Sequence, residues 1–106
     1  MTVRAADSNA DLGLSRGSLY LSVEYYTRYF NGLGSVILVN RDKQLLVMPV
    51  HNEASGGLLM KIRNARGDRI IHAQEFLAFH GLENVDEEVQ GKWDTELSAL
   101  VLNCPI

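Results

Sequence analysis

The sequence predicts an α+β protein, mostly β, built from two similar halves that each contain a strand, a short helix and a hairpin. Three observations lead to this prediction. Short apolar runs, several of them rich in β-branched residues, alternate with glycine-containing turns, as in antiparallel sheets. Two stretches have apolar residues at helical spacing but are only about two turns long. The order of these elements repeats at a separation of 50 residues.

Length and composition set the class of protein. The 106 residues have the length of one domain, which we expect to span residues 1–106. With 46% hydrophobic and 22% charged residues, the chain has enough apolar surface for a core, which excludes disorder as its main state. A single cysteine, Cys104, excludes an internal disulfide. Because no apolar run approaches the ~18–20 residues of a membrane span, we expect no membrane contact. The polar N-terminal residues do not resemble a signal peptide, and one thiol fits a reducing compartment, so we expect a cytoplasmic protein.

The predicted strands are the apolar runs between glycines and prolines. They cover residues 35–39, 45–48, 58–62, 70–71 and 97–102. The first two flank a polar turn and form a hairpin that ends at Pro49. A polar turn over residues 64–68 joins the third strand to the fourth, and Pro105 follows the last strand.

Two short helices are predicted over residues 23–30 and 73–80. Ser22 stands at the N-cap position of the first helix, where its hydroxyl accepts a hydrogen bond from an otherwise unpaired N–H. The sequence Asn31-Gly32 ends this helix, and Gly81 ends the second. Each helix has one apolar face at a spacing of three, and because both are so short, packing must hold them in place. The faces consist of Val23, Tyr26, Tyr29 and Phe30 in the first helix and of Ala73, Phe76, Leu77 and Phe79 in the second.

A shift of 50 residues aligns the two halves without gaps. Arg16-Gly17 falls on Arg66-Gly67, and the apolar positions of the first helix fall on those of the second. We therefore predict an internal duplication of residues 16–50 and 66–103, with a few extra residues in the second copy. The hairpin of residues 36–39 and 45–48 then matches a second hairpin of residues 88–93 and 97–102. The alternative is that any two strand–helix–hairpin units look alike at this level of comparison.

The unit resembles the swapped-hairpin fold of AbrB-like transcription regulators and addiction antidotes. Residues 64–82 carry the resemblance, with a polar glycine turn, two β-branched residues, a short helix with an acidic first turn, and Gly81-Leu82. Two copies in one chain resemble the MraZ-like branch, over about residues 15–103. The resemblance implies interleaved halves in a swapped-hairpin-like β-barrel, and DNA binding through a basic hairpin turn. The chain departs from the family at His72-Ala73, where proline is usual. The tandem branch also carries Asp-x-x-x-Arg in its DNA-reading turn, whereas this turn has Asn64 and Asp68 at those two positions and Arg69 one position later.

The predicted nucleic-acid-binding residues are basic side chains in and near the two turns. They are Lys61, Arg63, Arg66, Arg69 and Arg16. Such a cluster could contact phosphates, and arginine can also read guanine in the major groove. Two alternatives stay open: a polar strand edge that prevents aggregation, and a site for a protein or a small anion.

The charge distribution favours a second hypothesis, a protein-interaction or assembly module of the same fold that does not bind DNA. The net charge is −3, with +2 on residues 1–80 and −5 on residues 81–106. The acidic stretch 83–88 could mask the basic turn of a neighbouring molecule. Exposed strand edges and the tyrosines and phenylalanines of the helices lead us to expect a homo-oligomer.

The sequence does not favour an enzyme, a metal or a cofactor. The spacings of His51, His72, His80 and Cys104 match no common zinc pattern. His72 and Glu75 could form an acid–base pair across one helical turn, but many surface pairs have this spacing. Since Cys104 lies two residues from the end of the sequence, it is poorly placed as a shielded nucleophile.

Overall fold

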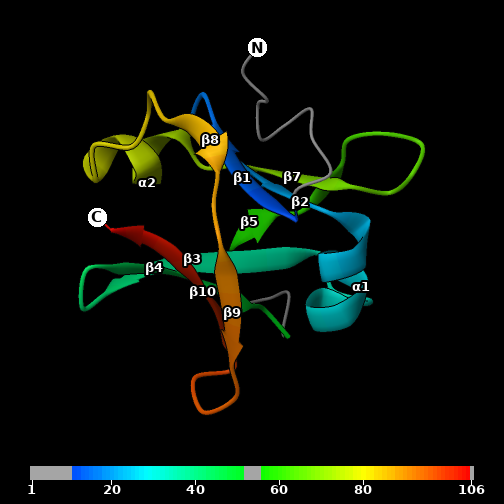
Figure 1. Ribbon diagram of the computed structural model, residues 1–106. Helices are drawn as coiled ribbons and strands as arrows, with labels where there is room; N and C mark the ends of the chain where they lie inside the picture. Colours follow the sequence, from blue (N-terminus) through cyan, green and yellow to red (C-terminus); the bar gives the residue numbers. More distant parts are fainter. Residues whose placement is uncertain (1–10, 52–55, 106) are drawn as a thin grey trace.

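The fold contains two five-stranded antiparallel sheets and two short helices (Figure 1). The computed structural model describes residues 11–51 and 56–105. In chain order the elements are β1 (Leu12–Ser15), β2 (Ser18–Leu21), α1 (Val23–Phe30), β3 (Ser35–Arg41), β4 (Gln44–Pro49), β5 (Leu58–Leu59), β6 (Lys61–Ile62), β7 (Arg69–His72), α2 (Gln74–Phe79), β8 (Asp86–Glu88), β9 (Gly91–Asp94) and β10 (Ala99–Pro105). Sheet A has the strand order β6-β7-β2-β1-β8, and sheet B has the order β5-β3-β4-β10-β9. The predicted α+β, mostly β, class is confirmed.

Each sheet combines strands from both halves of the chain. In sheet A, β2 pairs with β7 so that Tyr20 lies opposite Ile70. In sheet B, β4 pairs with β10 so that Leu46 lies opposite Val101. Tyr20 and Ile70 are 50 positions apart, as the predicted repeat would require, while Leu46 and Val101 are 55 apart. The repeat stays a prediction, but these registers fit it if the second copy carries five extra residues.

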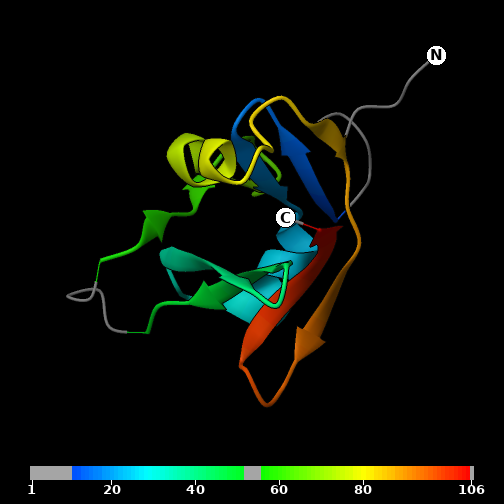
Figure 2. The same cartoon turned by 90° about the vertical axis from the view of Figure 1, so that its left-hand side faces the viewer.

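The chain crosses between the sheets at three places: through α1 between β2 and β3, between β5 and β6, and between β8 and β9. The last two crossings correct the sequence-based strand assignments. Residues 58–62 form two short strands in different sheets, because the chain bends at the buried Met60, whose N–H donates to the Gly34 carbonyl at 2.8 Å. On the other side, β8 belongs to sheet A and β9 to sheet B, as Figure 2 shows from the side. Glu88 is therefore not part of the second hairpin, where the sequence placed it.

The last hairpin is shifted relative to its prediction. It pairs β9 with β10, and β10 begins at Ala99 rather than at residue 97. Ser98 has a φ of 50°, which belongs to a turn and not to a strand. Asp94 stabilises this turn, since its Oδ1 accepts hydrogen bonds from the N–H groups of Glu96 and Leu97 at 2.9 and 3.0 Å.

The two helices lie on opposite sides of the molecule (Figure 1). Helix α1 has the predicted bounds, and its N-cap is Ser22 as predicted. Helix α2 is one residue shorter at each end than predicted. The prediction that Phe79 lies on the buried face of α2 is wrong, because Leu77 is fully buried while Phe79 is 84% exposed.

The core fills the space between the two sheets and under α1 and α2. Its fully buried large side chains are Phe30, Leu12, Leu14, Leu19, Leu21, Leu45, Ile71, Leu77, Leu100, Leu102, Val36 and Val47. Both halves contribute to this one core. Among the described strands, the pairings give two separate sheets and not the closed barrel that the sequence led us to expect. Within the described part of the chain, no helix is long and apolar enough to cross a membrane.

Candidate nucleic-acid interface

The turn between β6 and β7 is closed by the side chain of Asn64. Its Oδ1 accepts hydrogen bonds from the N–H groups of Gly67 and Asp68, both at 3.1 Å. The Arg63 N–H donates to the Asp68 carbonyl at 2.8 Å, which extends the ladder into the turn. Gly67 has a φ of 102°, a conformation that other residues rarely adopt. The spacing of asparagine, glycine and aspartate therefore encodes this turn locally.

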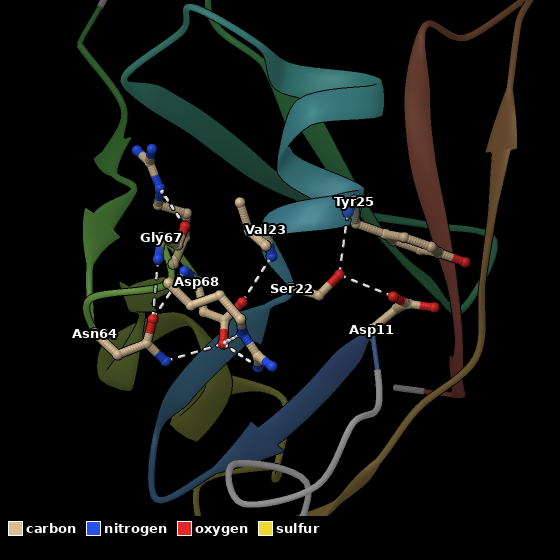
Figure 3. Close-up of polar contacts among 9 residues, drawn as sticks. Asp11, Ser22, Val23, Tyr25, Asn64, Gly67 and Asp68 are labelled. Atoms are coloured by element: carbon tan, nitrogen blue, oxygen red, sulfur yellow. Dashed lines mark hydrogen bonds and ion pairs between the residues drawn. The ribbon is translucent and has the colours of Figure 1, made fainter.

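The carboxylate of Asp68 is the centre of the turn (Figure 3). Asp68 is only 3% exposed, and its Oδ1 accepts the backbone N–H of Val23, at the start of α1, at 2.8 Å. Its Oδ2 accepts hydrogen bonds from Asn64 Nδ2 at 2.9 Å and from Arg66 Nε and Nη2 at 3.1 and 2.5 Å. The turn of the second half therefore caps the helix of the first half.

These hydrogen bonds determine the ionisation of Asp68. Burial alone would raise the pKa of this carboxyl, but the hydrogen bonds from Arg66, Asn64 and the backbone of Val23 outweigh it and lower the pKa to about 2. The same contact raises the pKa of Arg66 above its ordinary value. Asp68 is therefore a structural anion, a role that the sequence analysis missed. The Asn-x-x-Gly-Asp spacing of the turn is the signal that could have indicated it.

Ser22 is a second cap at the same helix end. Its Oγ accepts the Tyr25 N–H at 3.0 Å and donates to Asp11 Oδ1 at 2.8 Å (Figure 3). The start of α1 is thus held by a cap from its own segment and by Asp68 from the other half. Helix α2 has no side-chain cap, although the Ala73 N–H that precedes it donates to the Gly17 carbonyl at 3.0 Å.

Two of the predicted DNA-binding arginines are engaged within the turn. The Arg66 side chain is 57% exposed, but its Nε and one terminal nitrogen bind Asp68. Arg69 is half-buried, with its guanidinium carbon 3.7 Å from the centre of the Tyr26 ring and its Nε bonded to the Gly67 carbonyl at 3.0 Å. Arg69 therefore packs against α1, while Arg66 still presents part of its guanidinium to solvent.

Lys61 and Arg63 lie on the outer face of sheet A. Lys61 is opposite Ile70, which is itself opposite Tyr20, so these side chains share the face that points away from the core. The guanidinium of Arg63 lies 4.9 Å from the centre of the Tyr20 ring, which places it on this face as well. Both basic residues are exposed. They lie on the same face of the sheet, as the two-residue period of a strand predicts.

Arg16 lies in the turn between β1 and β2, at the opposite end of sheet A. This separation follows from the register, because Ser18 next to the first turn lies opposite His72, while Arg69 next to the second turn lies opposite Leu21. Arg16 is exposed and has a φ of 51°. The structure thus brings Lys61, Arg63 and Arg66 together and leaves Arg16 at the far end of the sheet.

Each turn also lies against the helix of the other half. A Cβ atom added at Gly17 would lie 3.1 Å from Cγ of Gln74 in α2. A Cβ atom added at Gly67 would lie 3.2 Å from Cγ2 of Val23 in α1. Glycine therefore permits a close approach of turn and helix at two equivalent places in the predicted repeat.

The acidic residues of β8, Asp86, Glu87 and Glu88, lie at the other edge of the same sheet. β8 pairs with β1, whereas the basic strand β6 pairs with β7, so the two charged edges are separated by three strands. Glu87 in β8 is opposite Leu14 and lies far from the basic turn in strand order. Among the described residues, the acid that binds an arginine of the turn is Asp68, through Arg66.

The remaining polar candidates have structural contacts. His72 Nδ1 lies 3.1 Å from Ser18 Oγ across β2 and β7. The His80 ring packs against Phe76 and Phe79, with centroid distances of 4.6 and 5.0 Å. Within residues 11–51 and 56–105, no three histidine, cysteine or acidic side chains are grouped as a metal site requires. Comparison with protein-family models, curated proteins and solved structures gave no match.

Proposed function

We propose that the protein is a small cytoplasmic transcription regulator of the AbrB/MraZ-like type, which binds double-stranded DNA through the outer face and the two turns of sheet A. One observation carries this proposal. The antiparallel register about Tyr20 and Ile70 sets the two turn arginines, Arg16 and Arg66, at opposite ends of one sheet. A duplex lying along the sheet would meet a basic turn at each end, which is the arrangement that the swapped-hairpin resemblance implies.

The proposed contacts are Arg16, Lys61, Arg63 and Arg66. The contact of Arg66 with Asp68 holds its guanidinium in one orientation, and the exposed remainder of the group can donate to a phosphate. Stacking on Tyr20 orients Arg63 in the same way. Arg69 supports this surface from beneath by fixing the turn to α1 and makes no phosphate contact in this proposal.

The pairing of the two halves also favours a particular kind of DNA site. Equivalent turns related by a two-fold axis match the two-fold symmetry of a duplex, as in dimeric regulators. Here one chain would supply both turns. Since the turn of the first half holds only Arg16, while that of the second half has Lys61 and Arg63 nearby, we expect an imperfect palindrome with one half-site more important than the other.

The proposal is tested by fluorescence anisotropy with a pool of random double-stranded DNA over a range of salt concentrations. Four phosphate contacts predict a slope of log K against log salt of about −3.6. The double variant Lys61→Glu with Arg63→Glu should weaken binding strongly and reduce the slope to about −2. The double variant Arg41→Glu with Lys43→Glu is the matched control, because it makes the same change of net charge at two exposed basic residues at the tip of the hairpin in sheet B.

Two results would count against this assignment. Absence of binding at low salt would exclude DNA as the ligand, and equal loss in the control would mean that the effect is one of net charge. The competing hypothesis, a protein-interaction module of the same fold, is favoured by the Asp68–Arg66 ion pair and by the acidic edge of sheet A. In that case the wild-type chain should capture a protein partner in a pull-down, and the double variant Lys61→Glu with Arg63→Glu should not.

A further inference from the structure

The outer face of sheet B is apolar although it points away from the core. In β3, Val36 and Leu38 are buried on the inner face, while Ile37 and Val39 lie on the outer one, and Ile37 is 42% exposed. In β4, Leu46 and Met48 lie on the outer face; Met48 is partly exposed, whereas Leu46 is already buried within the chain. Strands that are apolar on both faces are typical of sheets covered on both sides.

Strand pairing arranges this face in two rows of side chains. The first row runs Val39, Leu46, Val101 and Lys92 across β3, β4, β10 and β9. The second row, two residues further along the strands, contains Ile37 opposite Met48 and Ala99 opposite Asp94. Each row therefore consists of apolar residues in β3, β4 and β10 and ends in one charged residue in β9. The two charges have opposite sign.

We propose that a second copy of this chain docks on this face, about a two-fold axis that runs across the strands between the two rows. Such an axis places the first row of each copy opposite the second row of its partner. The contact is made by the apolar residues of the rows that keep exposed surface, since Leu46 and Ala99 are already buried; they are Ile37, Val39, Met48 and Val101. Lys92 of each copy meets Asp94 of the second copy. Because Asp94 Oδ1 is held by Glu96 and Leu97, the Oδ2 atom is the one that accepts the lysine ammonium.

The charges select this arrangement over the other symmetric one. If the axis ran parallel to the strands, β9 of one copy would lie over β3 of the other, and Lys92 would be buried against Val39 without a carboxylate. With the axis across the strands, Lys92 and Asp94 lie directly opposite each other between sheets that pack about 10 Å apart, a distance that the two side chains together can span. An open groove of about 850 Å³ lies beside the rows, with Leu46, Leu97 and Val101 in its lining. Most of the other lining residues are polar or charged, and Lys92 and Asp94 are among them, so the groove combines apolar contacts with the two charges that the proposed dimer pairs.

Sedimentation velocity over a range of protein concentrations tests the proposal. The wild-type chain should form a dimer with a dissociation constant on the order of micromolar. Ile37→Lys and Lys92→Glu should each weaken the dimer by roughly tenfold or more, since the second sets a glutamate against Asp94. The matched controls are Ile62→Lys and Lys61→Glu at the edge of sheet A, where Ile62 is also exposed. Circular dichroism and thermal unfolding show whether each variant is folded.

Cross-linking gives a second measurement that does not depend on variants. A carbodiimide joins an amine to a carboxylate in contact, and a mixture of ¹⁴N- and ¹⁵N-labelled chains distinguishes links between copies from links within one. A mixed-isotope Lys92–Asp94 link is expected. A monomer at all concentrations would overturn the proposal. A dimer that only the sheet A controls weaken, or one whose mixed-isotope links lie elsewhere, would also overturn it.

Discussion

Asp68 is the residue on which the candidate interface depends. In the sequence it is an acid within a basic turn, so it reads as a group that neutralises its neighbours. In the structure its buried carboxylate joins three parts of the molecule, because it receives hydrogen bonds from Arg66, from Asn64 and from the N-terminus of α1. It therefore orients the turn and fixes the position of the helix.

The depressed pKa of Asp68 predicts a pH dependence of stability. The pKa is about 2 in the folded protein against an ordinary value of 3.8. Because the folded value is the lower one, this stabilisation is fully present above about pH 4 and is lost as the pH falls towards 2. The shift corresponds to about 2 kcal/mol. Urea unfolding of the wild-type chain between pH 7 and pH 2 measures it.

The control for this prediction is Asp68→Asn, which cannot ionise. It should be less stable than the wild-type chain at pH 7, and the difference should shrink as the pH falls below 4. Glu87→Gln, at an exposed acid, should follow the wild-type curve. If wild type and Asp68→Asn lost stability in parallel, the low pKa of Asp68 would be wrong.

At the scale of elements, the two helices differ in how they are held. Both are short, and both start next to a turn of the other half. Helix α1 has two side-chain caps and buries Tyr26 and Phe30, while α2 has no side-chain cap and buries Leu77. Tyr29 of α1 stacks on Trp93 with a centroid distance of 4.9 Å, whereas Phe79, its counterpart in the predicted repeat, is exposed.

Substitution of turn glycines tests the contact between turn and helix. Gly67 and Gly32 both have positive φ, but only at Gly67 would a Cβ atom meet another group, at 3.2 Å from Val23. Gly32→Ala should cost about 1 kcal/mol for the backbone conformation alone. Gly67→Ala should cost about 2–3 kcal/mol, because α1 must also move. Urea unfolding compares the two, and equal costs would mean that the turn does not support the helix.

At the scale of the whole molecule, neither half has a core of its own. The central contacts of both sheets join one half to the other, through β2 with β7 and through β4 with β10. Leu19 and Ile71, both fully buried, lie opposite each other in the first of these pairs. Each half taken alone would expose this surface and lose two of its strand neighbours.

Splitting the chain tests this dependence. Fragments 1–56 and 57–106 are separated at two exposed glycines between β4 and β5. Each fragment should be unfolded alone by circular dichroism, and an equimolar mixture should regain the spectrum of the intact chain. The substitution Ile71→Ala in the second fragment should weaken this reassembly by about 2–5 kcal/mol. A fragment that folds alone would contradict the shared core.

The sequence by itself determined the elements whose signals are local. The spacing of apolar residues and the Ser22 cap predict α1 with its bounds, and two apolar runs around a polar turn predict the β3–β4 hairpin. Each of these depends on side chains a few residues apart, so the pattern is visible along the chain.

Only the tertiary structure decided where the chain changes sheets and which arginines stay accessible. The bend at Met60 and the division between β8 and β9 depend on partners more than 20 residues away, Gly34 for Met60 and Leu12 for Val89. Arg69 faces Tyr26, and Asp68 serves a helix 45 residues earlier in the chain. Charge can be counted from the sequence, but its availability to DNA depends on which side chains the fold sets beside it.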